Sequence, residues 1–483
     1  MFPARSKITV SIAIGAIVVL ANYAQAATIT WNGDGDGSSW HDADNWDLNQ
    51  VPVAGDDVII PDVVPTTVVV FSTGTTAINS LDCVEPFELT GGTLDIAATT
   101  AFNNTYTQNA GLLTGTSDVV VSELTRWNGG EIEGTTGTET FTANMGMEVG
   151  SGNDKNLDNR ILHFSGTANW TDGDIRLFNG AVFNVGATDT FNALADDHSL
   201  VSFNNGNFNN AGIFVVDVTN SISFAIDFLN TGTVDVKAGT LNFSSNTATH
   251  TAATITVANG ALLQFSGGTH DLDAATTLDA TDVLFSGGTV NMDGTYTLSG
   301  SSTTVSGGTV NFTGSITNGV VGALTITAGT ANFSNTEGSI TAETYTQTSG
   351  KLTGTSDVVV SGLTRWDGGE IEGTTGTETF TANMGMALGS DTQKVLDNRI
   401  LSYSGTANWT DGDIRFFNGA VFNVGATETF NALADDHRLF TDGTFNNRRD
   451  LRGRRPQQRW HFDRFVQFPQ HRHRGRAGWD AEL

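Results

Sequence analysis

The chain has little of what many exported proteins use to stabilise a fold. Of its 483 residues, one is cysteine, seven are proline and 16 % are charged. Cys83 cannot form an internal disulfide, so stability must come from packing, backbone hydrogen bonds or ions, and we interpret Cys83 as a small buried residue. The apolar content is too high for a solvated disordered chain. After residue 26, no apolar run is long enough to cross a bilayer as a helix.

Cations are also scarce, because 23 Lys and Arg residues face 52 Asp and Glu residues, for a formal net charge of −29. A polyanion of this kind repels nucleic acids and anionic lipid surfaces. It attracts cations, and Ca²⁺ prefers the carboxylate oxygens that this chain has in excess. We therefore expect no nucleic-acid partner.

Residues 1–26 have the pattern of a secretory signal. Arg5 and Lys7 form a positive start, Ile8–Ala21 is an apolar or small run, and Ala24–Ala26 is an A-x-A cleavage motif. The run has 14 residues, which is short for a membrane span. We expect a cleaved signal peptide and a secreted or cell-surface protein with no transmembrane segment after cleavage.

Residues 448–483 do not match the rest of the chain. They hold ten Arg and four acidic residues, whereas the preceding residues are strongly acidic. If the reading frame of Phe468–Glu482 is shifted by one base, fourteen of fifteen residues can match Phe228–Asn242. We interpret this tail as the product of a frameshift near Asn447 rather than as native structure.

Two long segments are near copies of each other. Residues 116–198 and 355–437 match at 71 of 83 positions, at a constant offset of 239. Weaker similarity extends the duplicated module to residues 105–210 and 344–447. Because this duplication is recent, residues present in both copies are not independent signs of selection.

A shorter period runs beneath the duplication. The motif S-G-G-T recurs every 20 residues, beginning at Ser266, Ser286 and Ser306, and the residues between alternate polar and apolar. Alternation indicates strands with one buried face, and a fixed period near 20 indicates stacked coils. We predict an all-β parallel β-helix solenoid over residues 63–447, with coils of about 20 residues, and favour right-handed winding. A string of β-sandwiches is the alternative, but its turns lack a fixed 20-residue return.

The segment 27–62 differs from the repeats. It holds three tryptophans, Trp31, Trp40 and Trp46, followed by the strand-like run D-D-V-I-I. The first coil of a solenoid exposes its core and needs a cover. We therefore predict that this segment is an N-terminal cap.

The same segment contains the one metal-site candidate of the sequence. Asn32, Asp34 and Asp36 alternate before a glycine, which resembles the first half of a calcium loop. The twelfth position is Ala43 rather than Glu, so Asp42 or Asp44 would have to supply the last ligand. The alternative is a polar turn without an ion.

The opening W-N-G-D-G-D-G-S-S-W (31–40) resembles the start of large bacterial surface proteins with β-helix repeats. The strings N-N-A-G (209–212) and N-T-G-T-V-D-V-K-A-G-T-L-N-F (230–243) are similar to repeats of autotransporter-like and filamentous-haemagglutinin-like exoproteins. The resemblance implies export to the cell surface or beyond, and adhesion or matrix roles.

The motif W-x-[GD]-G-[DE]-I occurs twice in each copy. It predicts carboxylates at equivalent turn positions, with a further Asp two residues earlier in two of the motifs: Glu131, Asp174, Glu370, Asp413, Asp172 and Asp411. Clustered carboxylates on one face serve β-helix enzymes that cut polysaccharides. Glu131 and Asp174 should lie two coils apart, about 10 Å, which is loose for a catalytic pair. We favour outward acids at a corner.

The remaining conspicuous side chains have plain interpretations. The motif tryptophans, which might be sugar-stacking platforms, are better explained by packing: Trp127, Trp170, Trp366 and Trp409. His198 and His437 are one duplicated position, which we interpret as a surface or turn histidine. The rare arginines should make local ion pairs: Arg126, Arg160, Arg176, Arg365, Arg399 and Arg415.

The chain lacks a phosphate loop, a nucleophile elbow, a CxxC pair and an HExxH motif. We therefore expect a secreted or cell-surface structural or adhesive protein without catalysis, which contacts carbohydrate or a host or matrix surface. No cofactor is required, and calcium is the one ion considered. The alternatives are a β-helix polysaccharide lyase or hydrolase, or a passive stalk for a lost C-terminal domain.

Overall fold

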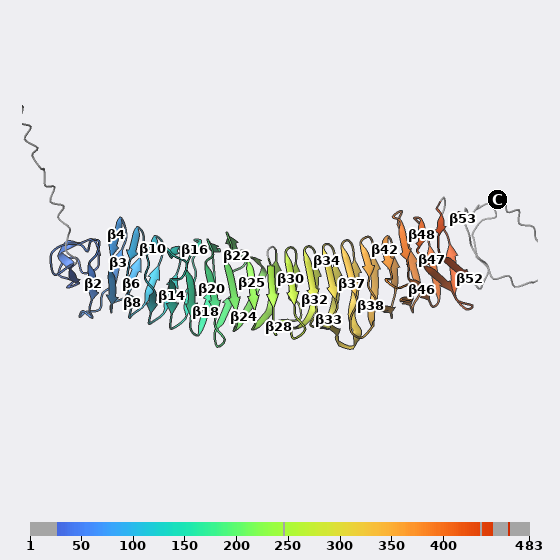
Figure 1. Ribbon diagram of the computed structural model, residues 1–483, viewed down its shortest axis with the longest axis horizontal. Coiled ribbons are helices and arrows are strands. Elements are labelled where there is room, and N and C mark those ends of the chain that lie inside the picture. The colour runs from blue at the N-terminus through green and yellow to red at the C-terminus, as the bar shows by residue number, and fades with distance from the viewer. Residues whose placement is uncertain (1–26, 245–246, 435–436, 448–461, 464–483) are drawn as a thin grey trace, which may run out of the picture.

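The computed structural model describes residues 27–244, 247–434, 437–447 and 462–463. The predicted signal segment 1–26 lies outside the described residues, as does the predicted frameshifted tail 448–483 except for the two-residue strand β53 (Phe462–Asp463). Figure 1 shows the described chain as one long rod, with β2 (Asp57–Ile60) near one end and β52 (Thr444–Asn447) near the other.

The rod is an all-β parallel solenoid of about 18 turns with about 21 residues per turn, as the sequence predicts. Each turn contributes strands to two long sheets, and each strand pairs in parallel with its equivalents one turn away. The S-G-G-T segments sit one above another, because β30 (Thr269–Leu272), β32 (Thr289–Met292), β34 (Thr309–Phe312) and β37 (Thr330–Phe333) pair in succession. Helix is limited in the described residues to two 3₁₀ turns, Ala43–Asn45 and Thr317–Gly319. Neither of these is long or apolar enough to cross a membrane.

The core is a continuous column of apolar side chains along the rod. Within T-V-N-F of β34, Val310 and Phe312 are buried, while Thr309 and Asn311 lie on the outer side. Equivalent aromatic residues stack from turn to turn, with ring centroids 4.8 Å apart for Phe312 and Phe333. Each turn therefore covers the apolar face of the one below, and no turn has a core of its own.

Close approach of neighbouring turns explains the second glycine of S-G-G-T. Gly288 and Gly308 have φ of +68° and +62°. A Cβ at Gly288 would lie 2.4 Å from the carbonyl oxygen of Gly268, and one at Gly308 would lie 2.4 Å from that of Gly288. Only glycine permits both the left-handed backbone and this contact.

The tryptophans of the N-terminal segment form one buried cluster. Trp46 lies edge-on to both Trp31 and Trp40, with centroids 4.9 Å apart in each pair. Trp40 also contacts Phe71 and Phe87, which belong to β3 (Val69–Phe71) and β6 (Phe87–Leu89). The cluster therefore packs onto the apolar side chains of the first turns.

The two copies of the duplicated module do not face the same way. Strand β19 (Ile175–Phe178) and its copy β48 (Ile414–Phe417) are equivalent in sequence. Eleven successive pairings, however, lead to β48 from β20 (Val182–Val185), the strand after β19. Equivalent residues therefore lie on different faces of the rod, roughly 55 Å apart along its axis at the usual strand spacing.

A polar column interrupts the core in the middle of the rod. The Asn210 amide donates to Asn230 Oδ1 at 2.9 Å, and the Asn230 amide lies 3.3 Å from His250 Nδ1. His270 lies beside this column, with its ring centroid 6.4 Å from that of His250. His250 Nε2 and His270 Nδ1 have no hydrogen-bond partner. Burial lowers the pKa of His250 to about 3 and that of His270 to about 4.

These depressed pKa values predict that the middle of the rod loses stability in acid. The ordinary histidine pKa is 6.5, so below that pH the unfolded chain binds protons that the folded chain does not. From pH 7 to pH 5 the loss should be roughly 2 kcal/mol per histidine, and it should continue toward pH 4. Native-state hydrogen exchange of β27 (Thr247–His250) and β30 measures this local free energy of opening.

The matched control is the double variant H250N/H270V. Asn continues the column of Asn210 and Asn230, and Val occupies the position paired with His270 one turn later, at Val290. We expect the opening free energy of this variant to depend much less on pH between 7 and 5. An equal dependence in both proteins would show that the two histidines are not its cause.

Candidate functional site

Each copy of the module displays a cluster of polar side chains where one turn is unusually long. The cluster of the second copy is built on β45 (Lys394–Asp397), β47 (Thr406–Trp409) and β48, and that of the first on β16 (Lys155–Asp158), β18 (Thr167–Trp170) and β19. Both clusters begin from the turn T-D-G-D that follows a buried tryptophan.

The tryptophan holds this turn from inside. Trp409 is buried, and its Nε1 donates to the carbonyl oxygen of Gly412 at 2.7 Å. Trp170 donates to Gly173 at the same distance, and the two glycines have φ of +72° and +69°. The left-handed glycine turns the chain so that the aspartates on either side of it lie at the surface.

A buried lysine ties the turn to the preceding loop. Lys394 Nζ donates to the carbonyl oxygens of Ser390, Thr392 and Asp411, each at 3.0 Å. In the first copy, Lys155 Nζ donates to Asp172 and Ser151 in the same way. Burial lowers the pKa of each lysine to about 8, although nearby carboxylates oppose the shift. The ammonium groups therefore act as internal cross-links between two stretches of backbone.

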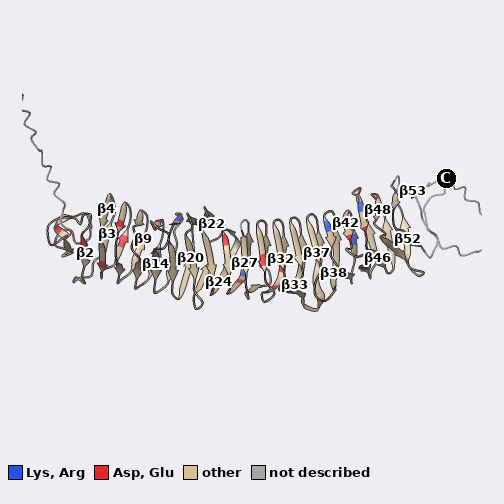
Figure 2. Ribbon diagram, in the orientation of Figure 1, with Lys and Arg blue, Asp and Glu red and all other residues tan. Residues whose placement is uncertain are grey.

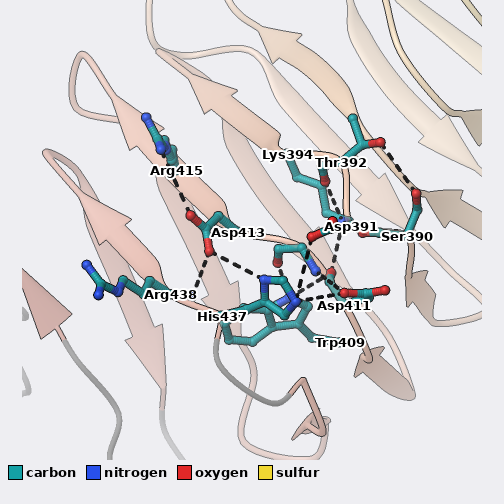
Figure 3. A network of polar contacts seen from close by, with 11 residues as sticks. Ser390, Asp391, Thr392, Lys394, Trp409, Asp411, Asp413, Arg415, His437 and Arg438 are labelled. Carbon is teal, nitrogen blue, oxygen red and sulfur yellow. Dashed lines mark hydrogen bonds and ion pairs between the residues drawn. The ribbon is translucent and has the colours of Figure 1, made fainter.

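His437 lies among the carboxylates of this surface, as Figure 3 shows. Its Nε2 lies 2.8 Å from Asp411 Oδ1 and 3.9 Å from Asp391 Oδ1, and its Nδ1 lies 3.6 Å from Asp413 Oδ1. In the first copy, His198 Nε2 lies 3.0 Å from Asp172 and Nδ1 lies 3.4 Å from Asp174.

The interpretation of these two histidines as solitary surface or turn residues was therefore wrong. The long turn, in which Ile175 pairs with Leu200, brings A-D-D-H back over T-D-G-D. Each imidazole consequently has a carboxylate at both of its ring nitrogens.

The predicted equivalence of Glu131 and Asp174 is not found. Glu131 lies within β13 (Gly130–Glu133) and shares a column with Asn156 and Arg176. Asp174 comes before β19 and lies outside that column. The strands that carry the two motifs are two turns apart, as expected, but they are shifted by two residues, because Lys155 pairs with both Gly130 and Ile175.

Glu131 and its copy Glu370 have different neighbours. Glu370 lies with Glu372 and Asp397, and Lys351 Nζ is 3.2 Å from both glutamates. In the first copy Leu112 takes the place of Lys351 in the pairing. Burial, then the charges of Asp158 and Glu133, raise the pKa of Glu131. A carboxyl whose pKa is raised binds cations less readily than one that stays ionised.

The tryptophans are packing residues, as we interpreted them. The four motif tryptophans have at most 1 % of their surface exposed, which excludes them as sugar-stacking platforms: Trp127, Trp170, Trp366 and Trp409. Trp127 and Trp170 share one column through Val149. Cys83 is also buried, and its thiol donates to the carbonyl oxygen of Glu85.

The arginines divide into two groups, and only one behaves as predicted. Ion pairs form at Arg126–Glu148, Arg176–Asp154, Arg365–Asp367 and Arg415–Asp413. For Arg160 and Arg399 the prediction of local ion pairs was wrong, because both side chains are buried and donate to backbone carbonyls. Arg399 donates to Glu372, Ser356, Thr379 and Gly354 at 2.8–3.3 Å, and Arg160 makes the equivalent four bonds.

We expect Arg399→Leu to destabilise the rod by about 3 kcal/mol or more, because four buried carbonyls lose charged donors. The matched control is Arg126→Leu, which breaks an exposed ion pair and should cost about 1 kcal/mol at most. Hydrogen exchange of the turns around each position reports the change. Equal small effects of the two substitutions would contradict the structural role of Arg399.

The N-terminal loop Asn32–Asp36 is held by its own hydrogen bonds. Asp36 Oδ1 accepts from the backbone N–H groups of Ser38 and Ser39 and from the Asn45 amide, at 2.8–2.9 Å. These bonds, led by that from Ser38, lower the pKa of Asp36. Asn32 Oδ1 accepts from the N–H of Asp34. This is the geometry of a polar turn, and calcium binding by Asn32, Asp34 and Asp36 stays a prediction.

No protein-family model, curated protein or solved structure matches this chain. The class that the structure defines is therefore the parallel β-solenoid, and function must be argued from the surface of the rod.

Proposed function

We propose that this protein is a secreted or cell-surface rod with a structural or adhesive function. The observation that carries the proposal is the repetition of outward polar side chains at each turn. The Asn291 amide donates to Asp271 Oδ1 at 2.7 Å, that of Asn311 to Asn291 at 2.8 Å, and that of Asn332 to Asn311 at 3.1 Å. A column of threonines, Thr269 to Thr330, runs parallel to it.

Such columns suit a polyhydroxylated partner. Each amide spends one N–H and one lone pair on its column neighbours, which leaves a further donor and acceptor for a ligand. Charged side chains are sparse along much of the rod (Figure 2), so contacts there would be neutral hydrogen bonds. Many weak and equally spaced contacts add up by multivalency. The partner we propose is therefore a carbohydrate, or a host or matrix surface rich in it.

Export is supported by the signal-like residues 1–26 and by the resemblance of the repeats to autotransporter-like and filamentous-haemagglutinin-like exoproteins. A long rod is a reasonable form for a protein that must reach outward from a cell. About 18 turns at the usual strand spacing extend roughly 85 Å.

Retention on immobilised polysaccharides and matrix proteins tests the proposal. The variant N291T/N311T/N332T removes three amides of the column, and threonine fits because it occupies the same column at Thr353. We expect about tenfold weaker retention with unchanged circular dichroism, since adjacent sites in an array multiply. Asn431→Thr, in a separate pair with Asn408, is the control and should change little. Failure of the native chain to bind any surface of the panel would leave a passive stalk as the better description.

A second candidate is a polysaccharide-degrading enzyme, favoured by the histidine and carboxylates around His437. Imidazole and carboxyl groups within reach of each other are the usual general acids and bases. Incubation with a polysaccharide panel, followed by assays for new reducing ends and unsaturated products, separates this from adhesion. We expect no products. Products that disappear in His437→Asn would make the lyase or hydrolase the better description.

A further inference from the structure

We infer that the second copy of the module holds a divalent transition metal ion, of the zinc class, between His437, Asp411 and Asp391. This site goes beyond the proposed adhesive function and does not depend on it. It also differs in chemistry from the calcium loop that the sequence suggests near Asp36, because one of its ligands is an imidazole nitrogen.

The three side chains converge on one point. His437 Nε2 is 2.8 Å from Asp411 Oδ1 and 3.9 Å from Asp391 Oδ1, and all three ligand atoms lie within 4.8 Å of one another. Ligands about 2.0–2.1 Å from zinc stand about 3.4 Å apart at the corners of a tetrahedron. The distances bracket that value, so small side-chain movements complete three corners. Asp391 is exposed, which leaves the fourth corner open to water.

The far side of the imidazole is arranged as in metal sites. Asp413 Oδ1 faces His437 Nδ1 at 3.6 Å and is itself fixed by the backbone N–H of Arg438 at 2.9 Å. A carboxylate at this nitrogen holds the proton on Nδ1, so the lone pair of Nε2 points toward Asp411 and Asp391. Figure 3 shows Asp413 on one side of the ring and the two proposed carboxylate ligands on the other.

The backbone positions the two aspartates in advance. Lys394 Nζ binds the carbonyl oxygens of Ser390 and Thr392, on either side of Asp391, and also that of Asp411. This cross-link sets the separation of the two ligands. The positive charges of Lys394 and Arg415 oppose a cation, but the carboxylates of Asp391, Asp411 and Asp413 outnumber them.

The first copy of the module is a natural variant with one ligand fewer. His198 Nε2 lies 3.0 Å from Asp172 Oδ1, as in the second copy, but Gly152 occupies the position of Asp391. Gly152 is not among the glycines with positive φ, and a Cβ built on it would lie 3.8 Å from Asp172 Oδ2. An aspartate is therefore sterically acceptable there and would point its carboxylate toward the existing pair.

Hydrogen exchange of the full chain with and without Zn²⁺ tests the site locally, so that binding elsewhere does not interfere. We expect zinc to slow exchange in the segments 390–413 and 437–440 but not in the equivalent segments of the first copy. Asp391→Gly, which reproduces the first copy, should weaken zinc binding by about 100-fold and abolish this protection. Gly152→Asp should create zinc-dependent protection around Asp172 and His198.

Calorimetric titration gives an independent readout, with one equivalent of zinc lost in Asp391→Gly and one gained in Gly152→Asp. An excess of Ca²⁺ should not displace the zinc, because calcium prefers oxygen ligands alone. The inference is overturned if zinc does not protect the second copy, if protection persists in Asp391→Gly, or if Gly152→Asp gains none.

Discussion

The backbone hydrogen bonds between successive turns are the interaction on which the rest of the structure depends. A strand such as β34 finds its backbone partners in the turns before and after it, β32 and β37. Parallel pairing in register also places like side chains on like: Phe312 lies on Phe333, and Asn311 lies on Asn291. Core, polar surface and glycine positions all follow from this single repeat distance.

Charged side chains enter the structure where turns depart from the regular repeat. Irregular turns turn carbonyl oxygens inward, and the buried cations Arg160, Arg399, Lys155 and Lys394 bond to these carbonyls. The acidic side chains of the same turns remain at the surface, where His198 and His437 meet them. The duplicated module thus combines an internal cation that fixes the backbone with an external histidine and carboxylates that are free for chemistry.

The regular part of the fold was predictable from the sequence, and the irregular part was not. The 20-residue return of S-G-G-T and the alternation in T-V-N-F give the turn length, the register and the buried face. Turn length varies, however: Thr289 pairs with Thr309 after 20 residues, but Val182 pairs with Asn207 after 25. This variation rotates one copy of the module relative to the other. It also hid the meeting of His198 with Asp172, because a uniform period places them apart.

In-register stacking can be tested directly with pairs of introduced cysteines. Thr289 and Thr309 are paired partners on the outer side of adjacent turns, where the expected Cα separation of about 4.8 Å permits a disulfide. Thr289 and Asn311 are displaced by two residues, and their Cα atoms should be about 8 Å apart, beyond disulfide reach. The account predicts ready oxidation of T289C/T309C and none of T289C/N311C. Equal oxidation of the two pairs, or oxidation of the second alone, would contradict it.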